Sequence, residues 1–427
     1  MSRQMKDSGV AWIGMMPDGW RIEKGKHVLV YLERPIKDTD SVVTCFRDGQ
    51  VTLRSNRREL GFTVSLQEIG YKGVEPGDLV VHGMDGFAGS IGISDSRGKC
   101  SPVLNILDSE EDKTFLMYYL RMMAYGNVFL ALSTGIRERT CDTNWNKLKE
   151  LPYPVPGRDV QNMIASTLTF KCAEIDKVVE QTRATIEEYK KLKQAIITEA
   201  VTKGVRGSRL MKPSGVEWIG DIPAGWKISR IKDLGKCSNG ISKSGEYFGT
   251  GSPFVTYKDV YDNFSIISPT GLIESNTEEQ STYSVEKDDV FFTRTSETIE
   301  EIGFSSVCCQ TIPNATFAGF IIRFRPQKGL LYCGYTKYYF RSNIHRSYFN
   351  KEMNIVTRAS LSQTLLKKLS VLLPQYKEQQ EIAAYLDTKC AEIDRIIEKK
   401  AQLIEELGSY KKSLIYEYVT GKKEVTA

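Results

Sequence analysis

QNMIASTLTFKCAEIDKVVEQTRATIEEYKKLKQAIITEAVTKG, residues 161–204, is the stretch that decides the fold, because the chain contains a second version of it. QQEIAAYLDTKCAEIDRIIEKKAQLIEELGSYKKSLIYEYVTGK occupies residues 379–422. The two copies are offset by 218 positions and share the identical block KCAEID. A repeat of this length indicates one structural unit used twice, so the sequence predicts two related halves.

Both copies carry apolar residues at spacings that alternate between four and three positions. In each copy eight of ten such positions are apolar, while Glu, Lys, Gln and Arg fill the intervening places and proline is absent. This pattern predicts a long helix with a narrow apolar seam, which is typical of a coiled coil. The seam residues are Leu168, Cys172, Ile175, Val179, Ile186, Tyr189, Ile196, Leu386, Cys390, Ile393, Ile397, Ile404, Leu407 and Leu414.

A single amphipathic helix of this kind usually packs on its own domain. Two copies in matching register instead favour pairing of the two helices along their seams. If each helix pairs with its counterpart across a pseudo-twofold axis perpendicular to both, the pair is antiparallel. The two domains that precede the helices are then expected at opposite ends of the pair.

A second repeat precedes each of these domains. SGVAWIGMMPDGW at residues 8–20 and SGVEWIGDIPAGW at residues 214–226 share nine of thirteen residues. Trp12, Trp20, Trp218 and Trp226 are expected to be apolar anchors that join each domain to the helices, and the alternative is that they face a partner protein. By the pseudo-twofold, the first copy should pack near residues 419–423, so that the chain is organised as a closed circle.

The domains between the repeats, residues 21–156 and 227–374, share only a few short segments of similar sequence. VEPGDLVVHG corresponds to VEKDDVFFTR, and LKELPYPVP corresponds to LKKLSVLLP. Runs rich in β-branched and aromatic residues predict strands at 78–82, 103–107, 289–293 and 318–324, and helices are predicted at 113–131 and 331–349. The expected fold class is therefore α+β, with two globular domains separated by the antiparallel helix pair.

The repeats divide the chain into four segments. We expect a Trp-rich segment with the first domain at 1–157, a long helix at 158–205, the repeated Trp-rich segment with the second domain at 206–374, and the second long helix at 375–427.

Composition limits the class of protein. The 427 residues are 26% charged and 41% hydrophobic, without an apolar run of 18 residues or a signal-peptide pattern at the N-terminus. Nine cysteines at irregular spacing favour reduced thiols, and hence a cytoplasmic location. The formal net charge of +5 permits a nucleic-acid partner without demanding one.

Motifs for catalysis are missing from the sequence. The chain has neither a G-x-x-x-x-G-K-[ST] phosphate loop nor an Asn-Pro-Pro-aromatic segment, and its three histidines offer little for metal or general-base chemistry. The glycines of GMDGFAGSIG, residues 83–92, are expected in a loop or at a strand end, and Asp288 and Asp289 in a solvated turn. No catalytic residue and no metal site is predicted.

The paired WIG-x-x-P-x-GW and KCAEID motifs make the chain resemble the specificity subunits of type I restriction–modification enzymes over its whole length. The resemblance implies a non-catalytic DNA-reading subunit in which each variable domain recognises one half of a split double-stranded DNA sequence. It implies that the helices fix the gap between the half-sites and dock two methyltransferase subunits, and that restriction and motor subunits join the complex. S-adenosylmethionine, ATP and Mg²⁺ would then belong to those partner subunits.

Basic residues in the two domains are the candidates for DNA contact. The segment at 337–358 has five basic residues, one acidic residue and interleaved aromatics that are expected to be mostly core. Arginine can pair with phosphates or read guanine edges. The candidates are Arg54, Arg57, Arg58, Arg137, Arg139, Lys258, Arg294, Arg341, Arg346, Lys351 and Arg358.

Two other functions compete with DNA reading. A coiled-coil adaptor that binds only protein would share the helices, and a gel-shift assay with methyltransferase subunits would distinguish it. A fused restriction–methylation enzyme would need catalytic motifs that the sequence lacks, and a methylation assay on the pure chain would detect it.

Overall fold

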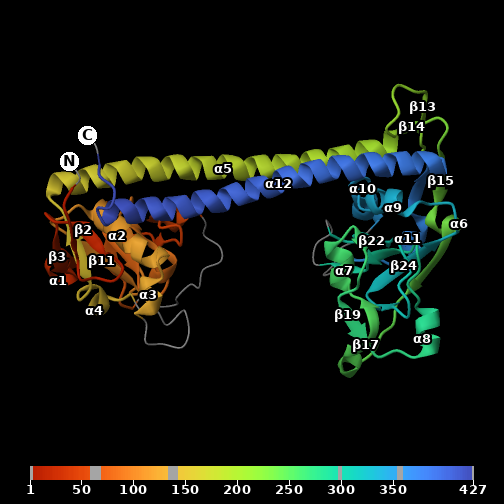
Figure 1. Cartoon of the computed structure of the whole chain (residues 1–427). Helices are drawn as coiled ribbons and strands as arrows, with labels where there is room; N and C mark the ends of the chain where they lie inside the picture. The colour runs from red at the N-terminus through yellow and green to blue at the C-terminus, as the bar shows by residue number, and fades with distance from the viewer. Residues whose placement is uncertain (1–2, 58–68, 133–142, 297–300, 353–358, 426–427) are drawn as a thin grey trace. The chain divides into compact units, whose positions relative to one another are not determined.

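A computed structural model of the chain describes residues 3–57, 69–132, 143–296, 301–352 and 359–425. The residues group by their contacts into two units (Figure 1). Unit 1 comprises Met1–Arg183 and Ala401–Ala427, and unit 2 comprises Ala184–Lys400. Both units mix helices with strands, which confirms the predicted α+β class with two domains.

The described residues of unit 1 form short strands and four short α-helices, together with parts of two long helices. The short helices are α1 (Gly25–Val28), α2 (Lys113–Tyr125), α3 (Val128–Ala131) and α4 (Trp145–Leu148). The strands are β1 (Met5–Asp7), β2 (Met15–Pro17), β3 (Arg21–Lys24), β4 (Val30–Tyr31), β5 (Val43–Cys45), β6 (Val51–Leu53), β7 (Lys72–Val74), β8 (Leu79–His82), β9 (Ile91–Ile93), β10 (Gly98–Cys100), β11 (Leu104–Asp108) and β12 (Pro152–Val155).

Unit 2 has the same kinds of element and shares the long helices α5 (Arg158–Lys203) and α12 (Tyr376–Val419). Its short helices are α6 (Ile231–Leu234), α7 (Tyr257–Asp262), α8 (Thr277–Thr282), α9 (Cys333–Tyr339), α10 (Ile344–Glu352) and α11 (Gln363–Lys368). Its strands are β13 (Met211–Pro213), β14 (Asp221–Pro223), β15 (Lys227–Arg230), β16 (Gly235–Asn239), β17 (Phe248–Val255), β18 (Ser265–Ile266), β19 (Gly271–Ile273), β20 (Val290–Thr293), β21 (Thr295–Ser296), β22 (Ser305–Cys308), β23 (Thr316–Phe317), β24 (Ile321–Pro326), β25 (Ala359–Ser360) and β26 (Ser370–Leu373).

The main sheets of the two units have the same strand order. Unit 1 has the order β4-β11-β8-β9, and unit 2 has β16-β24-β20-β22 with β18 added at the edge. The central strands are paired in the same register, since His82 faces Leu104 in unit 1 and Thr293 faces Ile321 in unit 2. The two domains therefore share one architecture although their sequences have diverged.

A buried aspartate begins the central strand in each unit. Asp78 and Asp289 each accept a hydrogen bond of 2.8 Å from the backbone N–H three residues earlier, and each pairs with an arginine, Arg34 or Arg325. The expectation of a solvated Asp289 is wrong, because its side chain is fully buried and the Arg325 guanidinium compensates the carboxylate.

The structure contains the predicted strands and helices with two kinds of boundary difference. The strand expected at 318–324 begins at Ile321, because the Ile321 N–H closes a turn by donating to the Ala318 carbonyl. The helix expected at 113–131 is divided at Asn127, whose φ of 57° is left-handed and ends the regular helical path. The one expected at 331–349 is divided between α9 and α10, where the Ser342 hydroxyl donates to the Tyr339 carbonyl.

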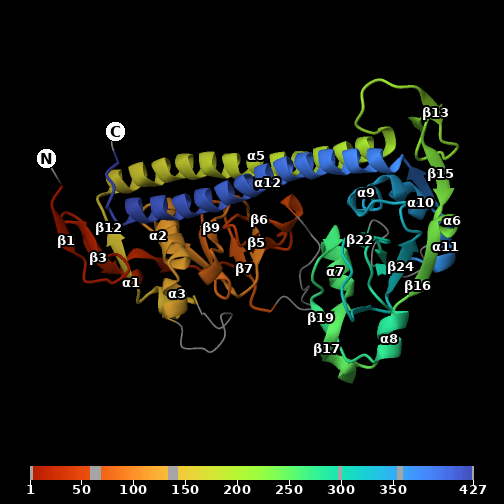
Figure 2. The same ribbon diagram turned by 45° about the vertical axis from the view of Figure 1, so that its right-hand side comes forward.

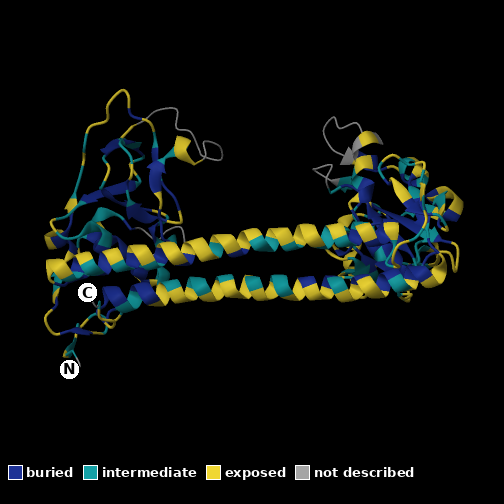
Figure 3. Cartoon of the chain, turned by 90° about the horizontal axis from the view of Figure 1, so that it is seen from above, coloured by how far each residue is buried: buried dark blue, intermediate teal, exposed yellow. Residues whose placement is uncertain are grey.

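The predicted seam residues lie on the covered side of the long helices. Each of the fourteen is buried or half-buried, while the residues of the opposite faces are largely exposed (Figure 3). In unit 1, Leu168, Cys172 and Ile175 of α5 share a core with Leu414 of α12. In unit 2, Leu386 and Cys390 of α12 share a core with Ile197 and Val201 of α5. Figures 1 and 2 both show the two helices side by side within each unit.

Two ion pairs between the helices are related by the repeat. In unit 1 the Lys411 ammonium lies 2.6 Å from the Asp176 carboxylate, and in unit 2 the Lys193 ammonium lies 2.7 Å from the Asp394 carboxylate. Both aspartates end a KCAEID block, and both lysines occupy polar positions of the seam pattern. The two lysines, which interrupt the apolar seam of their helices, thus form the same contact in each unit.

The Trp-rich repeats form two β-hairpins, β1–β2 and β13–β14. Trp20 and Trp226 are buried, and each is covered by an arginine guanidinium, from Arg3 and Arg209 respectively. Trp12 is half-buried, and its indole N–H donates to the Tyr119 hydroxyl over 3.0 Å. Each hairpin therefore places its Trp side chains against the core of its own unit.

The first hairpin contacts the end of the second long helix, as the sequence predicts. The Lys422 ammonium donates to the carbonyl of Ile13 over 2.5 Å, and Trp20 shares a core with Tyr418 and Val419. Gly421 has φ of +71° and lies against Pro17 so closely that a β-carbon would collide with the ring. Residues 419–422 are consequently fitted to the hairpin, and the predicted contact is confirmed.

The helices of the described ranges do not include one that is both long and apolar enough to cross a membrane.

Candidate nucleic-acid interface

The end of the central strand is an equivalent place in the two units. In unit 1 the Gly83 N–H donates to the Val103 carbonyl, and the Thr143 N–H donates to the Gly83 carbonyl. In unit 2 the same two bonds run from Arg294 to Phe320 and from Leu361 to Arg294. The backbone is thus conserved between the two units at this strand end, while the side chains differ.

In unit 1 this strand end borders a cavity of about 500 Å³. The cavity lies between the β5–β6 hairpin and the turn that follows β8. Its lining residues are Val43, Thr44, Cys45, Phe46, Arg47, Arg54, His82, Met84, Asp85, Ser101, Val103 and Leu104. The described lining residues combine apolar side chains with hydrogen-bond donors and one carboxylate, a combination that is common in ligand-binding sites.

Three polar residues of this cavity are held in place by an ion pair and by hydrogen bonds to the backbone. An Arg47 Nη2 lies 3.2 Å from Asp85 Oδ1. The His82 Nδ1 accepts hydrogen bonds from the backbone N–H groups of Met84 and Asp85, at 3.2 and 3.0 Å. Burial lowers the pKa of His82 below its ordinary value, so the ring is neutral at pH 7 and carries its hydrogen on Nε2. Arg47, His82 and Asp85 were not among the sequence candidates.

Arg54 and Arg57, which the sequence nominates, lie on the same hairpin of unit 1. The Arg54 Nε donates to the Thr44 hydroxyl over 2.9 Å, and its side chain lines the cavity. Arg57 pairs with Asp48 at 2.6 Å, and its guanidinium stands 4.4 Å from the centre of the Phe46 ring. The candidates Arg58, Arg137, Arg139 and Arg358 lie outside the described residues.

In unit 2 the equivalent strand end carries Arg294 and Phe320, and the adjoining helix α7 carries Lys258. Lys258 is exposed at the start of α7, and the neighbouring Tyr257 hydroxyl donates to the Thr295 carbonyl over 2.7 Å, which ties α7 to this place. Arg294 is half-buried, and the Phe320 side chain is 66% exposed. An exposed aromatic ring beside cationic groups suits stacking or apolar contact with nucleic-acid bases.

The side chains of Arg341 and Arg346 point into the interior of unit 2 and not toward solvent. The Arg341 guanidinium donates to the carbonyls of Val260, Tyr261 and Ser305, and the Arg346 guanidinium donates to the carbonyl of Ile302. Both lie against aromatic rings, and burial lowers the pKa of Arg346 to about 10. These two side chains stabilise the fold between α7, β22 and α10.

Lys351 is exposed, whereas the aromatic residues of the same segment, 337–358, are buried. Lys351 is exposed and lies 3.1 Å from the carboxylate of Glu217 in the second Trp-rich hairpin segment. The aromatics Tyr338, Tyr339, Phe340, Tyr348 and Phe349 are buried, which confirms the expectation that they are core.

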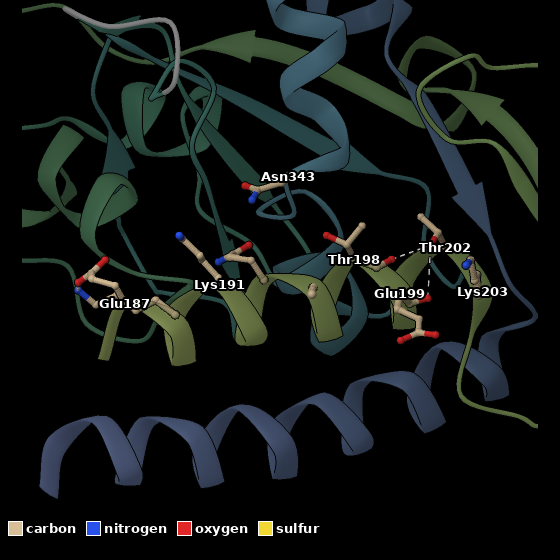
Figure 4. A pocket seen from close by; sticks show the side chains of 10 residues that line it. Glu187, Lys191, Thr198, Glu199, Thr202, Lys203 and Asn343 are labelled. Carbon is tan, nitrogen blue, oxygen red and sulfur yellow. Dashed lines mark hydrogen bonds and ion pairs between the residues drawn. The ribbon is translucent and has the colours of Figure 1, made fainter. Parts of the chain in front are cut away.

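A larger hollow of about 790 Å³ lies along α5 in unit 2 (Figure 4). Its residues are Glu187, Lys190, Lys191, Gln194, Ala195, Thr198, Glu199, Thr202 and Lys203 of α5, with Asn343 from the loop before α10. Lysines and glutamates alternate along it, and Lys190 pairs with Glu187 at 2.8 Å. This hollow is an exposed flank of the helix with groups of both charges.

Comparison with known proteins gives three kinds of match. Residues 223–406 match the family model described as the type I restriction modification DNA specificity domain. The chain is 23% identical to the StySPI specificity subunit of Salmonella potsdam over 73% of its length, and the match spans 65% of that relative, just under two thirds. It is 22% identical to the EcoKI specificity subunit of Escherichia coli K12, over 97% of this chain and 91% of that relative.

Solved structures share the fold. A chain from a type I R-M system, studied for its assembly and conformational transition, superposes with a TM-score of 0.73 at 15% identity, covering 96% of this chain and 99% of that one. The HsdS subunit from Thermoanaerobacter tengcongensis superposes with a TM-score of 0.53 at 15% identity, covering 96% and 98%.

Proposed function

We propose that this chain is a non-catalytic specificity subunit of a type I restriction–modification enzyme, and that unit 1 and unit 2 each read one half of a bipartite DNA sequence. The single observation that carries the proposal is the equivalent strand end in the two units. The side chains around it differ: in unit 1, His82, Asp85 and Arg47 line the adjoining cavity, whereas in unit 2 the strand end carries Arg294 and Phe320, with Lys258 on α7. Since base readout depends on side chains, the two half-sites should differ and the full site should not be palindromic.

The long helices are proposed to form one antiparallel pair that sets the gap between the half-sites. Asp176 of α5 contacts Lys411 of α12 in unit 1, whereas Lys193 of α5 contacts Asp394 of α12 in unit 2. A later residue of α5 thus contacts an earlier residue of α12, as antiparallel helices require. The buried or half-buried seam residues of both helices support the same pairing. DNA rises 3.4 Å per base pair, so a rigid helix pair of fixed length would determine a fixed number of base pairs.

The exposed flanks of the long helices are proposed to dock two methyltransferase subunits in the cytoplasm, with restriction and motor subunits joining the complex. S-adenosylmethionine, ATP and Mg²⁺ would be bound by those partners. Affinity for DNA is expected to depend on the methyltransferases, because residues 21–155 of the first domain carry as many acidic as basic residues, 18 of each. Tight specific binding by the pure chain would contradict this expectation.

The test is to map methylated adenines in the genome of cells that express the chain with its methyltransferase subunits. The expected result is one asymmetric motif made of two specific halves and a constant nonspecific gap. Methylation at a palindromic or an ungapped motif would overturn the proposal. A gel shift of the assembled complex that shows no DNA binding would instead favour a protein-only adaptor.

A further inference from the structure

We infer that the cavity beside β8 in unit 1 is a base-reading pocket, which takes the major-groove edge of a G·C base pair through Arg47 and Asp85. The inference rests on the proposed function and adds a prediction about the sequence of one half-site.

Arg47 supplies the donors. It lies two residues after the end of β5, and its side chain is 63% exposed where it lines the cavity. Its ion pair with Asp85, at 3.2 Å, is partly exposed to solvent, so exchanging it for another partner costs little. An arginine that is oriented but weakly held is suited to form bidentate hydrogen bonds from its guanidinium group to an incoming guanine.

Asp85 supplies the acceptor in a fixed position. Its backbone N–H donates to His82 Nδ1, and its carbonyl accepts from the N–H groups of Ala88 and Ser90, at 3.0 and 3.3 Å. Its side chain is 30% exposed. A carboxylate so placed accepts a hydrogen bond from an amino group without reorganising the loop.

His82 adds a second donor among the residues that line the cavity. Its Nδ1 is occupied by two backbone N–H groups, which leaves Nε2–H as the polar group that the ring presents elsewhere. The donors of Arg47 and His82 therefore accompany a single carboxylate, Asp85, among the described lining residues.

This set of groups matches a G·C pair better than an A·T pair. Guanine presents two acceptors, N7 and O6, beside the amino donor of cytosine. Adenine is read most often by the amide of asparagine or glutamine, and neither residue type occurs among the described residues that line the cavity. The geometry of Arg47 beside Asp85 places donors next to an acceptor, as the edge of a G·C pair requires.

The experiment uses the full chain assembled with its methyltransferase subunits. Adenine methylation is mapped in cells for the wild type, for Arg47→Ala and Asp85→Asn, and for the control Lys24→Ala. Lys24 forms a comparably exposed pair with Glu150 at 2.9 Å on β3 of the same unit and does not line the cavity. We expect Arg47→Ala to relax one G·C position of the half-site read by unit 1 by roughly 5- to 150-fold. The other half-site, the gap and the Lys24→Ala pattern should stay as in the wild type.

A chemical substitution distinguishes reading of the base from an effect on folding. In competition binding with the purified complex, 7-deazaguanine at that position removes the N7 acceptor. Wild-type complex should lose affinity for the modified duplex, whereas the Arg47→Ala complex should bind both duplexes equally. Arg47→Lys, which keeps the charge but loses the fork, should retain total binding and lose the preference for guanine.

Three results would overturn the inference. They are a unit 1 half-site without a G·C pair, variants with unchanged base preference, and a uniform loss of affinity that indicates a phosphate contact. Each leaves the proposed function intact, provided that the wild type shows an asymmetric bipartite motif. Absence of that motif would instead contradict the proposed function itself.

Discussion

His345 shows how a single residue makes the stability of unit 2 depend on pH. It is buried against Tyr339, whose carbonyl lies 3.1 Å from His345 Nε2, and burial lowers the pKa of His345 to about 3. The ordinary value is 6.5, so between pH 6.5 and 3 the unfolded chain binds a proton that the folded chain does not. The free energy of unfolding should therefore fall as the pH is lowered through this window.

The expected loss from this residue is about 1.4 kcal/mol between pH 7.5 and pH 5.5, measured by chemical denaturation of the full chain. His345→Gln should reduce that loss by about the same amount. His27→Gln is the control, because His27 is exposed on α1. Parallel pH profiles for the wild type and His345→Gln would show that His345 is not the group responsible.

Individual residues are also where reasoning from sequence reaches its limit for the candidate site. Arg341 and Arg346 have the composition of a DNA contact, yet their guanidinium groups bind carbonyls inside unit 2. The aromatic residues around them were the available signal, since long basic side chains can lie along rings in a core. Arg47 and Asp85 could not have been nominated together, because only the folded hairpin brings residues 38 positions apart to one cavity.

At the scale of elements, a repeated glutamine joins each long helix to its domain. Gln161 accepts from the Asp112 N–H and donates to the Pro156 carbonyl, both at 2.9 Å. Gln379, at the equivalent position, accepts from the Tyr332 N–H at 2.8 Å and donates to the Pro374 carbonyl at 3.0 Å. Both side chains are almost fully buried. The start of each helix is thereby fixed to the loop before it and to the helix that follows the central sheet.

Gln379→Ala should destabilise unit 2 by about 2–4 kcal/mol, because it leaves buried backbone groups without hydrogen-bond partners. Urea denaturation of the full chain measures the change. Gln402→Ala is the matched control, since Gln402 is an exposed glutamine of α12 that bonds only to Glu406 in the described structure. Equal stability of the two variants would mean that the Gln379 side chain does not hold the helix start.

Helices and strands were predicted well from the sequence where a single hydrophobic period runs through the whole segment. The long helices follow from seam spacing that extends over the whole repeat, and strands such as β8 and β20 follow from short apolar runs. The breaks in the shorter helices were missed, because Asn127 and Ser342 end a helix through backbone geometry and local hydrogen bonds. Those effects do not change the apolar pattern from which helices are predicted.

At the scale of the molecule, the proposed gap-setting role of the helices makes a numerical prediction. Residues 181–187 and 399–405 are equivalent heptads that lie between the two lysine–aspartate ion pairs. Deleting both removes about 10 Å of helix, which corresponds to roughly three base pairs. The methylation map should show a gap shortened by about three base pairs, with both half-sites unaltered.

The matched control exchanges the two heptads between the helices, which keeps the lengths and should keep the gap. A deletion variant that methylates sites with the original gap would rule out the helices as its determinant. The identity of the target bases was beyond prediction from sequence at this scale, because it depends on side chains that converge only in the folded domains.

The division of the units along the chain has a consequence for biosynthesis. Unit 2 is one continuous stretch, residues 184–400, whereas unit 1 needs residues from Ala401 onward to complete its core with Leu414, Tyr418 and Val419. A ribosome makes every residue of unit 2 before it makes the last part of unit 1. The domain that is synthesised first is therefore completed last, and until then its apolar surface around Trp20 and Leu168 lacks the α12 side chains that cover it in the folded chain.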